Sequence, residues 1–200
     1  MKLYGDNLSG NCYKVNLVAS ILGIPLEKVS MNILRGDTRT LEFLQKNPNG
    51  KIPILELADG RILSESNAIV NFLARESELI PQDPFDLAKT QEWQFFEQYS
   101  HEPNIAVARF INKYLGLPEE RRVEFESKQA GGHKALRVME EQLSRTQFLV
   151  GNHFSVADIS LFAYTHVANE GGFDLMPYPR ISEWLKSIEN IPGFMRMEGF

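Results

Sequence analysis

Apolar and polar positions at the start of the chain follow the periods of a strand, a helix and a second strand. The run KLYG at residues 2–5 predicts a strand, and residues 11–22 place apolar side chains on one face of a helix. Gly23 followed by Pro25 ends that helix. KVSMNI at residues 28–33 predicts a second strand, parallel to the first if the helix is a crossover. This order is that of a βαβ unit.

The next stretch predicts a helix, a hairpin and a further helix. A short helix is expected over residues 40–46. Two strand-like runs, KIPILEL at 51–57 and RILSE at 61–65, flank an Ala-Asp-Gly turn and predict a β-hairpin. SNAIVNFLARES then starts a helix at Ser66. Together these elements predict a small mixed sheet with helices.

Strand signals stop after this point, and the rest of the chain has helical periodicity. The expected helices cover 87–115, a segment from Pro118 to about 143, FSVADISLFAYTHVA and YPRISEWLKSIEN. Gly131 and Gly132 predict a kink or break in the second of these. The Pro-bearing segment LIPQDPFD reads as a linker. We therefore expect an α/β domain at residues 1–77, a linker at 78–87 and an all-α domain at 88–200.

Composition and charge narrow the classes of function. A net charge of -5 gives no electrostatic case for binding nucleic acid. MKLYGDN lacks a basic segment followed by an apolar run, and no apolar stretch reaches membrane-spanning length, so neither a secretory signal nor a membrane span is expected. The single cysteine forms no internal disulfide, which fits the reducing cytoplasm.

Pro53 is the informative residue of KIPILE. Proline cannot donate to a β-ladder and is usually confined to strand starts, edges or bulges. A cis Ile52-Pro53 bond would present the backbone of Ile52 to an extended peptide, which could pair with it as an added strand. The alternative is an ordinary trans proline opening an edge strand, which is the commoner state of such bonds.

Four segments, taken together with the helical second half, carry a family resemblance. They are LYGDNLSGNC, NPNGKIPIL, LSESNAIVNFLA and FSVADISL. This constellation resembles the cytosolic glutathione transferases, and LSxxC is most similar to their serine-type branch, theta-like or bacterial. The resemblance implies a thioredoxin-like N-terminal domain, an all-helical C-terminal domain and a homodimer. It also implies conjugation of glutathione, as a co-substrate and without another cofactor, to a hydrophobic electrophile in detoxification.

The resemblance assigns residues to the glutathione peptide. Ser66, by hydroxyl and backbone, would hold the γ-glutamyl carboxylate, because free N–H groups at a helix start favour an anion. Glu65 would accept from the ammonium of glutathione, and Ile52, held by Pro53, would pair with its cysteinyl backbone. Either Lys51 or Arg39 would meet the glycyl carboxylate. Without the resemblance, Ser66 reads as a helix cap and the two cations as solvated surface charges.

Three residues near the start of the first helix are candidates for interacting with the sulfur of glutathione. Ser9 would donate a hydrogen bond to the glutathione thiolate, and Asn11 would share or take over that role through its amide. Cys12 is the alternative, because relatives with a cysteine in this turn form a mixed disulfide with glutathione. A buried structural thiol is the other reading of Cys12. Ser9 alone reads as a turn or cap residue.

Other candidate side chains lie in the second half. Tyr99, Arg109 and Tyr164 are candidates for a second-substrate pocket, although each also fits packing or surface. Ser155 and Asp158 have the spacing of a capping box, so Asp158 is assigned to folding. The four histidines show no close pair with metal-ligand spacing, and no metal site is expected.

Three functions remain open from sequence. The first is a glutathione transferase that uses Ser9 and Asn11. The second is a non-catalytic module of the same fold that acts through binding. The third is a glutathione thiol-disulfide oxidoreductase that depends on Cys12.

Overall fold

A computed structural model describes residues 1–6 and 8–197 of the 200-residue chain. The chain divides into two compact units, of which the second is Glu78–Asn190. The first joins Met1–Ser77 to the C-terminal segment that starts at Ile191. The sequence-based division placed that last segment in the helical domain, whereas the structure groups it with the first unit.

The first unit is built on a four-stranded mixed sheet. Its strands are β1 (Lys2–Gly5), β2 (Glu27–Ser30), β3 (Ile54–Glu56) and β4 (Ile62–Ser64), in the order β2-β1-β3-β4. β1 is parallel to β2, while β3 is antiparallel to both β1 and β4. The predicted βαβ unit and β-hairpin are therefore confirmed.

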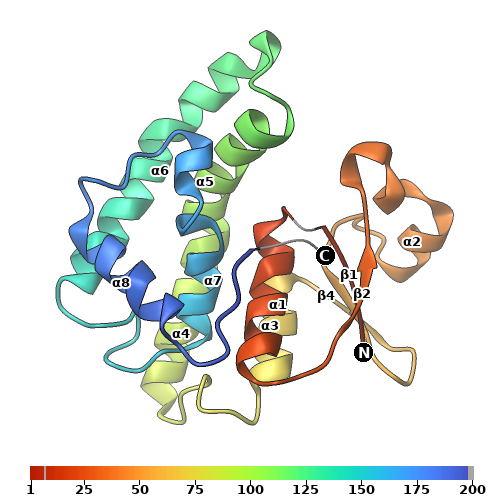
Figure 1. Ribbon diagram of the computed structural model, residues 1–200, viewed down its shortest axis with the longest axis horizontal. Helices are drawn as coiled ribbons and strands as arrows, with labels where there is room; N and C mark the ends of the chain where they lie inside the picture. The colour runs from red at the N-terminus through yellow and green to blue at the C-terminus, as the bar shows by residue number, and fades with distance from the viewer. Residues whose placement is uncertain (7, 198–200) are drawn as a thin grey trace. The chain divides into compact units, whose positions relative to one another are not determined.

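Helices cover both faces of this sheet. α1 (Gly10–Ile21) and α3 (Ser66–Ala74) pack together on one face, and α2 (Leu41–Lys46) lies on the other (Figure 1). Two short 3-10 helices, Ile33–Arg35 and Asp37–Arg39, precede α2. Leu3, Val15, Val18, Ile54 and Ile69 are fully buried between sheet and helices. This is the predicted thioredoxin-like arrangement, and it brings the start of α1 and the start of α3 together.

The C-terminal segment is fastened to α1. The hydroxyl of Tyr13 donates to the carbonyl of Met195 at 2.7 Å, and that of Ser20 donates to the carbonyl of Gly193 at 2.7 Å. Gly193 has a φ of +81°, and a Cβ there would lie 2.8 Å from the Cα of Ile21. Only glycine fits such a close approach.

The second unit is all-helical, as predicted. Its α-helices are α4 (Pro84–Phe96), α5 (Glu102–Arg109), α6 (Arg122–Leu143), α7 (Val156–Thr165) and α8 (Pro179–Glu189). π-helical segments Glu97–His101 and Phe110–Tyr114 follow α4 and α5, and 3-10 helices occur at Glu119–Arg121 and Ala168–Gly171. Every residue of α7 is buried, so α7 forms the centre of this unit.

Two details of the first long helix differ from the prediction. The helix begins at Pro84, so the last residues of the expected linker at 78–87 are helical, with Asp83 as the N-cap. The helix then widens into the π-helical segment Glu97–His101 just before Pro103. Proline has no N–H to donate to the preceding turn and its ring crowds that turn, which accounts for the irregularity.

The break expected at Gly131 and Gly132 is wrong, because α6 runs without interruption through both residues. A Cβ at Gly132 would lie 2.2 Å from Cε1 of Phe173, and one at Gly131 would lie 2.3 Å from Oδ1 of Asn104. The two glycines therefore provide room for neighbouring side chains, and packing offsets their low helix propensity.

The predicted capping box at the start of α7 is confirmed. The Ser155 hydroxyl accepts from the Ala157 N–H, and the buried Asp158 carboxylate accepts from the Ser155 N–H at 2.9 Å. Asp158 also accepts from the Leu149 N–H and from the Trp184 indole, both at 2.9 Å. Burial raises the pKa of Asp158 to about 6, although these donors oppose the shift.

Candidate functional site

Ser9 forms the N-cap of α1, at the point where the chain leaves β1. Its φ and ψ of -76° and 118° are extended, and its hydroxyl oxygen accepts from the backbone N–H of Cys12 at 3.3 Å. The Ser9 N–H donates to the Asp6 carbonyl at 3.2 Å, which closes the turn. The same hydroxyl lies close enough to the Cys12 thiol to lower its pKa, and its hydrogen can rotate to another acceptor. Ser9 is half-buried, so a ligand can reach it.

Asn11, Lys14 and Ser66 form a hydrogen-bonded cluster between α1 and α3. Oδ1 of Asn11 accepts from Nζ of Lys14 at 2.8 Å and from Oγ of Ser66 at 3.1 Å. Nζ of Lys14 also lies 3.3 Å from Oγ of Ser66. Lys14 is fully buried and Ser66 nearly so. The structure thus brings together two predicted site residues, Asn11 and Ser66, that are far apart in sequence.

Lys14 is a member of this cluster that the sequence reasoning missed. It lies one helical turn after Asn11, in the stretch YKVNLVAS, whose side chains are otherwise mostly apolar. A lysine inside such a stretch is unusual, because lysine is almost never fully buried unless it is paired. That single charge in an apolar helix was the available signal.

Glu65 and Ser66 lie at the N-terminal end of α3. Glu65 is the N-cap residue, is exposed, and has a φ of +69°, a conformation that is rare for residues other than glycine. Its side chain makes no capping hydrogen bond to the helix. The first N–H groups of α3 are therefore not satisfied by this cap, and with the helix dipole they favour an anionic group at Ser66.

The loop before β3 carries the remaining predicted glutathione-binding residues. The Ile52-Pro53 peptide bond is cis, Pro53 is buried and Ile52 is half-buried. Lys51 is exposed, and its carbonyl accepts from the Asn47 amide at 2.8 Å. The guanidinium of Arg39 lies against Gly50 in the same loop, where a Cβ would come within 2.6 Å of Nη1. Both candidate cations therefore lie at the loop that leads into the cis bond, Arg39 against Gly50 and Lys51 next to Ile52 in the sequence.

Cys12 is sealed within the first unit. Its side chain is fully buried, and Sγ accepts from the Asp6 N–H at 3.5 Å. Burial raises the pKa of the Cys12 thiol to about 12, against the opposing effects of the Ser9 hydroxyl and the Asp6 amide. A thiol in this state is neither a strong nucleophile nor accessible to a disulfide partner. The structure therefore favours the structural reading of Cys12.

The three candidates for a second-substrate pocket lie in different surroundings in the second unit. Tyr99 is 82% exposed, whereas Tyr164 is buried in α7 and Arg109 is buried at the end of α5. Nε of Arg109 forms an ion pair with Glu170 at 2.7 Å, so its charge already has a partner. This ion pair gives Arg109 a structural role in the second unit.

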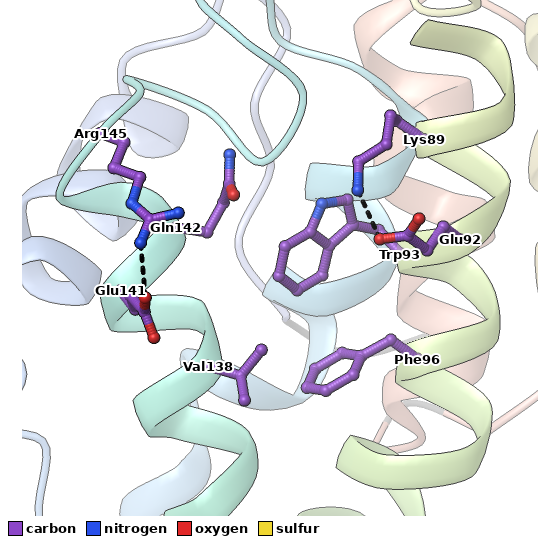
Figure 2. A pocket seen from close by; sticks show the side chains of 8 residues that line it. All are labelled: Lys89, Glu92, Trp93, Phe96, Val138, Glu141, Gln142 and Arg145. Carbon is purple, nitrogen blue, oxygen red and sulfur yellow. Dashed lines mark hydrogen bonds and ion pairs between the residues drawn. The ribbon is translucent and has the colours of Figure 1, made fainter. Parts of the chain in front are cut away.

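A pocket of about 280 Å³ opens between α4 and α6 within the second unit. Figure 2 shows the rings of Trp93 and Phe96 facing Val138 across it. An ion pair flanks the pocket on each side, Lys89 with Glu92 on α4 and Arg145 with Glu141 at the end of α6. Gln142 completes the lining.

The described part of the chain offers neither a metal-binding cluster nor a membrane-spanning helix. Among residues 1–6 and 8–197, no cluster of three or more His, Cys, Asp or Glu side chains is arranged to hold a metal ion. None of the helices in these residues combines the length and the apolar character needed to span a membrane.

Comparison with known proteins gives the same family for both units. The family described as "Glutathione S-transferase, N-terminal domain" matches residues 3–81, and "Glutathione S-transferase, C-terminal domain" matches residues 96–192. The crystal structure of a glutathione S-transferase from Pseudomonas fluorescens is 59% identical with a TM-score of 0.97, and the match covers 98% of each chain.

Two curated relatives represent different kinds of protein. Glutathione S-transferase 3 of Zea mays is 30% identical over 208 residues, covering 98% of this chain and 92% of the relative. Elongation factor 1-gamma of Drosophila melanogaster is 33% identical over 161 residues, covering 80% of this chain and 36% of that protein. The second match extends over only one part of a longer protein.

Proposed function

Since the chain belongs to the glutathione S-transferase family, we propose that it activates glutathione as a thiolate and transfers it to a hydrophobic electrophilic small molecule. The sulfur forms a bond to the electrophilic carbon, a leaving group departs with its electron pair, and the thiol proton passes to solvent. Glutathione is a co-substrate in this reaction, which needs no further cofactor. We place the reaction in the cytoplasm, as part of detoxification.

Thiolate activation is the main contribution that we assign to the site. A free thiol with a pKa near 8.5 is only about 3% ionised at pH 7. Lowering that pKa by about 2 units raises the ionised fraction to about 75%, which corresponds to roughly 2.7 kcal/mol. Shifts of this size occur beside helix N-termini and charge-stabilising hydrogen-bond donors.

The arrangement of Ser9 is the observation that carries this proposal. Its half-buried hydroxyl caps α1 by accepting from the Cys12 N–H, and it keeps its own hydrogen, which can turn from the Cys12 sulfur to a thiolate bound at the start of α1. Ser9 therefore stabilises the thiolate and is not itself the nucleophile. Asn11, two residues later and half-buried, assists from the same turn.

The remaining positions match the other groups of glutathione. The N-terminal end of α3 at Ser66 suits the γ-glutamyl carboxylate, and the exposed Glu65 suits its ammonium. Ile52 pairs with the cysteinyl backbone. Arg39 and Lys51, which flank the same loop, suit the glycyl carboxylate.

A pH titration of thiolate absorbance tests the proposal. Bound glutathione is titrated in the native protein and in Ser9→Ala, with the signal of the protein alone subtracted. We expect a thiol pKa well below that of free glutathione, and a return toward the free value in Ser9→Ala. No depression in the native complex would refute thiolate activation, and a depression that survives Ser9→Ala would move the role to Asn11 or the helix terminus.

One comparison favours a second candidate function. The match to part of elongation factor 1-gamma indicates that this fold also occurs within a longer protein that is not named as a transferase. A non-catalytic binding module would neither be retained on immobilised glutathione nor conjugate a model electrophile such as chlorodinitrobenzene. Retention together with conjugation would exclude this candidate.

We also propose that two copies of the chain associate through α4. Phe85 and Phe95 are 71% and 64% exposed, although both are large and apolar. Phe96 lies three helical turns after Phe85 and lines the pocket between α4 and α6. Exposed aromatic side chains beside a pocket with an apolar centre and charged flanks are typical of protein interfaces. A second copy would cover this surface.

A further inference from the structure

We propose that Lys14 is a positioning residue that orients the Asn11 side-chain amide, so that its Nδ2 donor and not its oxygen is presented to the glutathione sulfur. This inference rests on the thiolate mechanism proposed above. It concerns a residue that the sulfur does not contact, because Lys14 is fully buried behind the turn that carries Ser9 and Asn11.

The burial of Lys14 is the first step of the argument. A buried ammonium loses its hydration, and this loss is tolerated only where other polar groups replace the water. Two of those groups are Oδ1 of Asn11 at 2.8 Å and Oγ of Ser66 at 3.3 Å. Both belong to the candidate site, so the ammonium is placed where it acts on the site's hydrogen bonding.

The direction of the hydrogen bonds is the second step. A lysine ammonium only donates, so the atom of Asn11 that faces it has to be the carbonyl oxygen. Ser66 accepts from Lys14 through Oγ and uses its own hydrogen to donate to Oδ1 of Asn11 at 3.1 Å. The three side chains form a closed ring of hydrogen bonds, in which Lys14 and Ser66 both donate to Oδ1 of Asn11. The Asn11 oxygen is therefore fixed toward the interior.

The consequence for the ligand is the third step. The oxygen and nitrogen of a carboxamide lie on opposite sides of its axis, so fixing Oδ1 inward turns Nδ2 the other way. A flipped amide would present its oxygen lone pairs to a thiolate, which repels them. Removing the ammonium removes the group that distinguishes the two orientations, since a serine hydroxyl both donates and accepts.

The test replaces Lys14 by a side chain of similar length without donors. In Lys14→Met we expect the pKa of the bound glutathione thiol to rise by about 1 unit, a tenfold loss of thiolate at a pH below that pKa. The affinity for S-methylglutathione, which has no thiol to ionise, should change less than threefold. Lys46→Met is the matched control, because Lys46 lies in the same unit but pairs with Glu56.

A double-mutant cycle separates positioning from a general loosening of the unit. If Lys14 acts through Asn11, the Lys14→Met change has no further effect on the thiol pKa in an Asn11→Ala background. Lys14→Gln is the second variant if Lys14→Met does not fold. Its amide offers both a donor and an acceptor, so the thiol pKa should lie between those of the native protein and Asn11→Ala.

The outcomes distinguish this inference from the mechanism on which it rests. A depressed thiol pKa in the native protein that Lys14→Met and Lys14→Gln leave unchanged overturns the role of Lys14 alone. Equal effects of Lys14→Met with and without Asn11 overturn it as well, as does a parallel loss of S-methylglutathione binding. A native protein without any depression overturns both the thiolate mechanism and the positioning role.

Discussion

The hydroxyl oxygen of Ser9 lies 3.3 Å from the backbone nitrogen of Cys12 and accepts its N–H. This bond joins two residues with opposite surroundings, because Ser9 is half-buried at the start of α1 whereas Cys12 is fully buried within it. The helix thus uses the serine as a cap and the cysteine as part of the core. A ligand that approaches this turn meets the hydroxyl and not the protein thiol.

Replacement of Cys12 should leave the transferase reaction intact. Because burial raises the Cys12 pKa to about 12, the thiol stays neutral across pH 7–9 and does not compete with the glutathione thiolate. We expect Cys12→Ala to conjugate chlorodinitrobenzene within about twofold of the native rate. Iodoacetamide should alkylate Cys12 only after unfolding in urea. Rapid alkylation of the folded protein, or activity lost in a folded Cys12→Ala, would support the oxidoreductase alternative instead.

Removal of the Asp158 carboxylate should strongly destabilise the second unit. Asp158 accepts from the backbone N–H groups of Leu149 and Ser155 and from the Trp184 indole, all buried. Asp158→Ala leaves these donors without a partner, at a cost of about 3 kcal/mol in the free energy of unfolding. Urea unfolding measures this loss. Glu126→Ala, at an exposed position in α6, is the control and should cost less than about 0.5 kcal/mol. A similar loss of stability in both variants would contradict the structural role assigned to the Asp158 carboxylate.

Features encoded by neighbouring residues could be predicted from the sequence. The cap at Ser155 and Asp158 needs only residues three positions apart, and the β3–β4 hairpin needs only its turn. The start of α1 at Ser9 is local in the same way, since the serine caps the turn that follows it. Such features depend on backbone groups within one turn, so the pattern of residue types was sufficient to predict them.

Features that depend on distant residues could not be predicted in this way. The role of Gly132 in α6 is set by Phe173, which the sequence does not place beside it. The Lys14 cluster joins residues 52 positions apart through Ser66, so the sequence marks Lys14 as an unusual charge in an apolar helix but does not identify its partner. In both cases tertiary packing determines the partner, and local propensity does not identify that partner.

Acid should destabilise the second unit through His166. Burial lowers the pKa of His166 to about 4, whereas an unfolded histidine titrates near 6.5. Between these values the unfolded chain binds a proton that the folded chain does not, so His166's contribution to stability is complete above about pH 6.5 and falls as the pH falls. The expected loss is about 2 kcal/mol between pH 7.5 and pH 5.

His166→Gln isolates this effect from other titrations. The contribution of Asp158 to the pH dependence of stability has the opposite sign. Because its pKa is raised to about 6, protonation of Asp158 adds to the free energy of unfolding as the pH falls from 7 toward 5. The difference in the free energy of unfolding between the native protein and His166→Gln cancels that contribution. Urea unfolding at both pH values should show the difference shrinking or reversing at pH 5. His153→Gln, at an exposed position, should show no such change; a pH-independent difference for His166→Gln would contradict the prediction.

A charge placed on the exposed face of α4 should separate the two copies of a dimer. Phe95 is 64% exposed and adjoins Phe96, which lines the pocket with Trp93 and Val138. If a second copy covers this face, Phe95→Glu buries an unpaired carboxylate in the interface, a change that typically costs several kcal/mol. The free chain should tolerate it, because the position is solvent-exposed there.

Light scattering at micromolar concentration measures the result. The native protein should have about twice the chain mass of 22.8 kDa, and Phe95→Glu should fall toward that single mass while remaining folded by circular dichroism. Val123→Glu is the matched control, because Val123 is 80% exposed near the start of α6, away from the pocket-lining residues. A native monomer would refute the dimer itself. A dimer that persists in Phe95→Glu would show that the interface does not include this face of α4. A solvent-exposed phenylalanine outside the interface can be replaced by glutamate without affecting association.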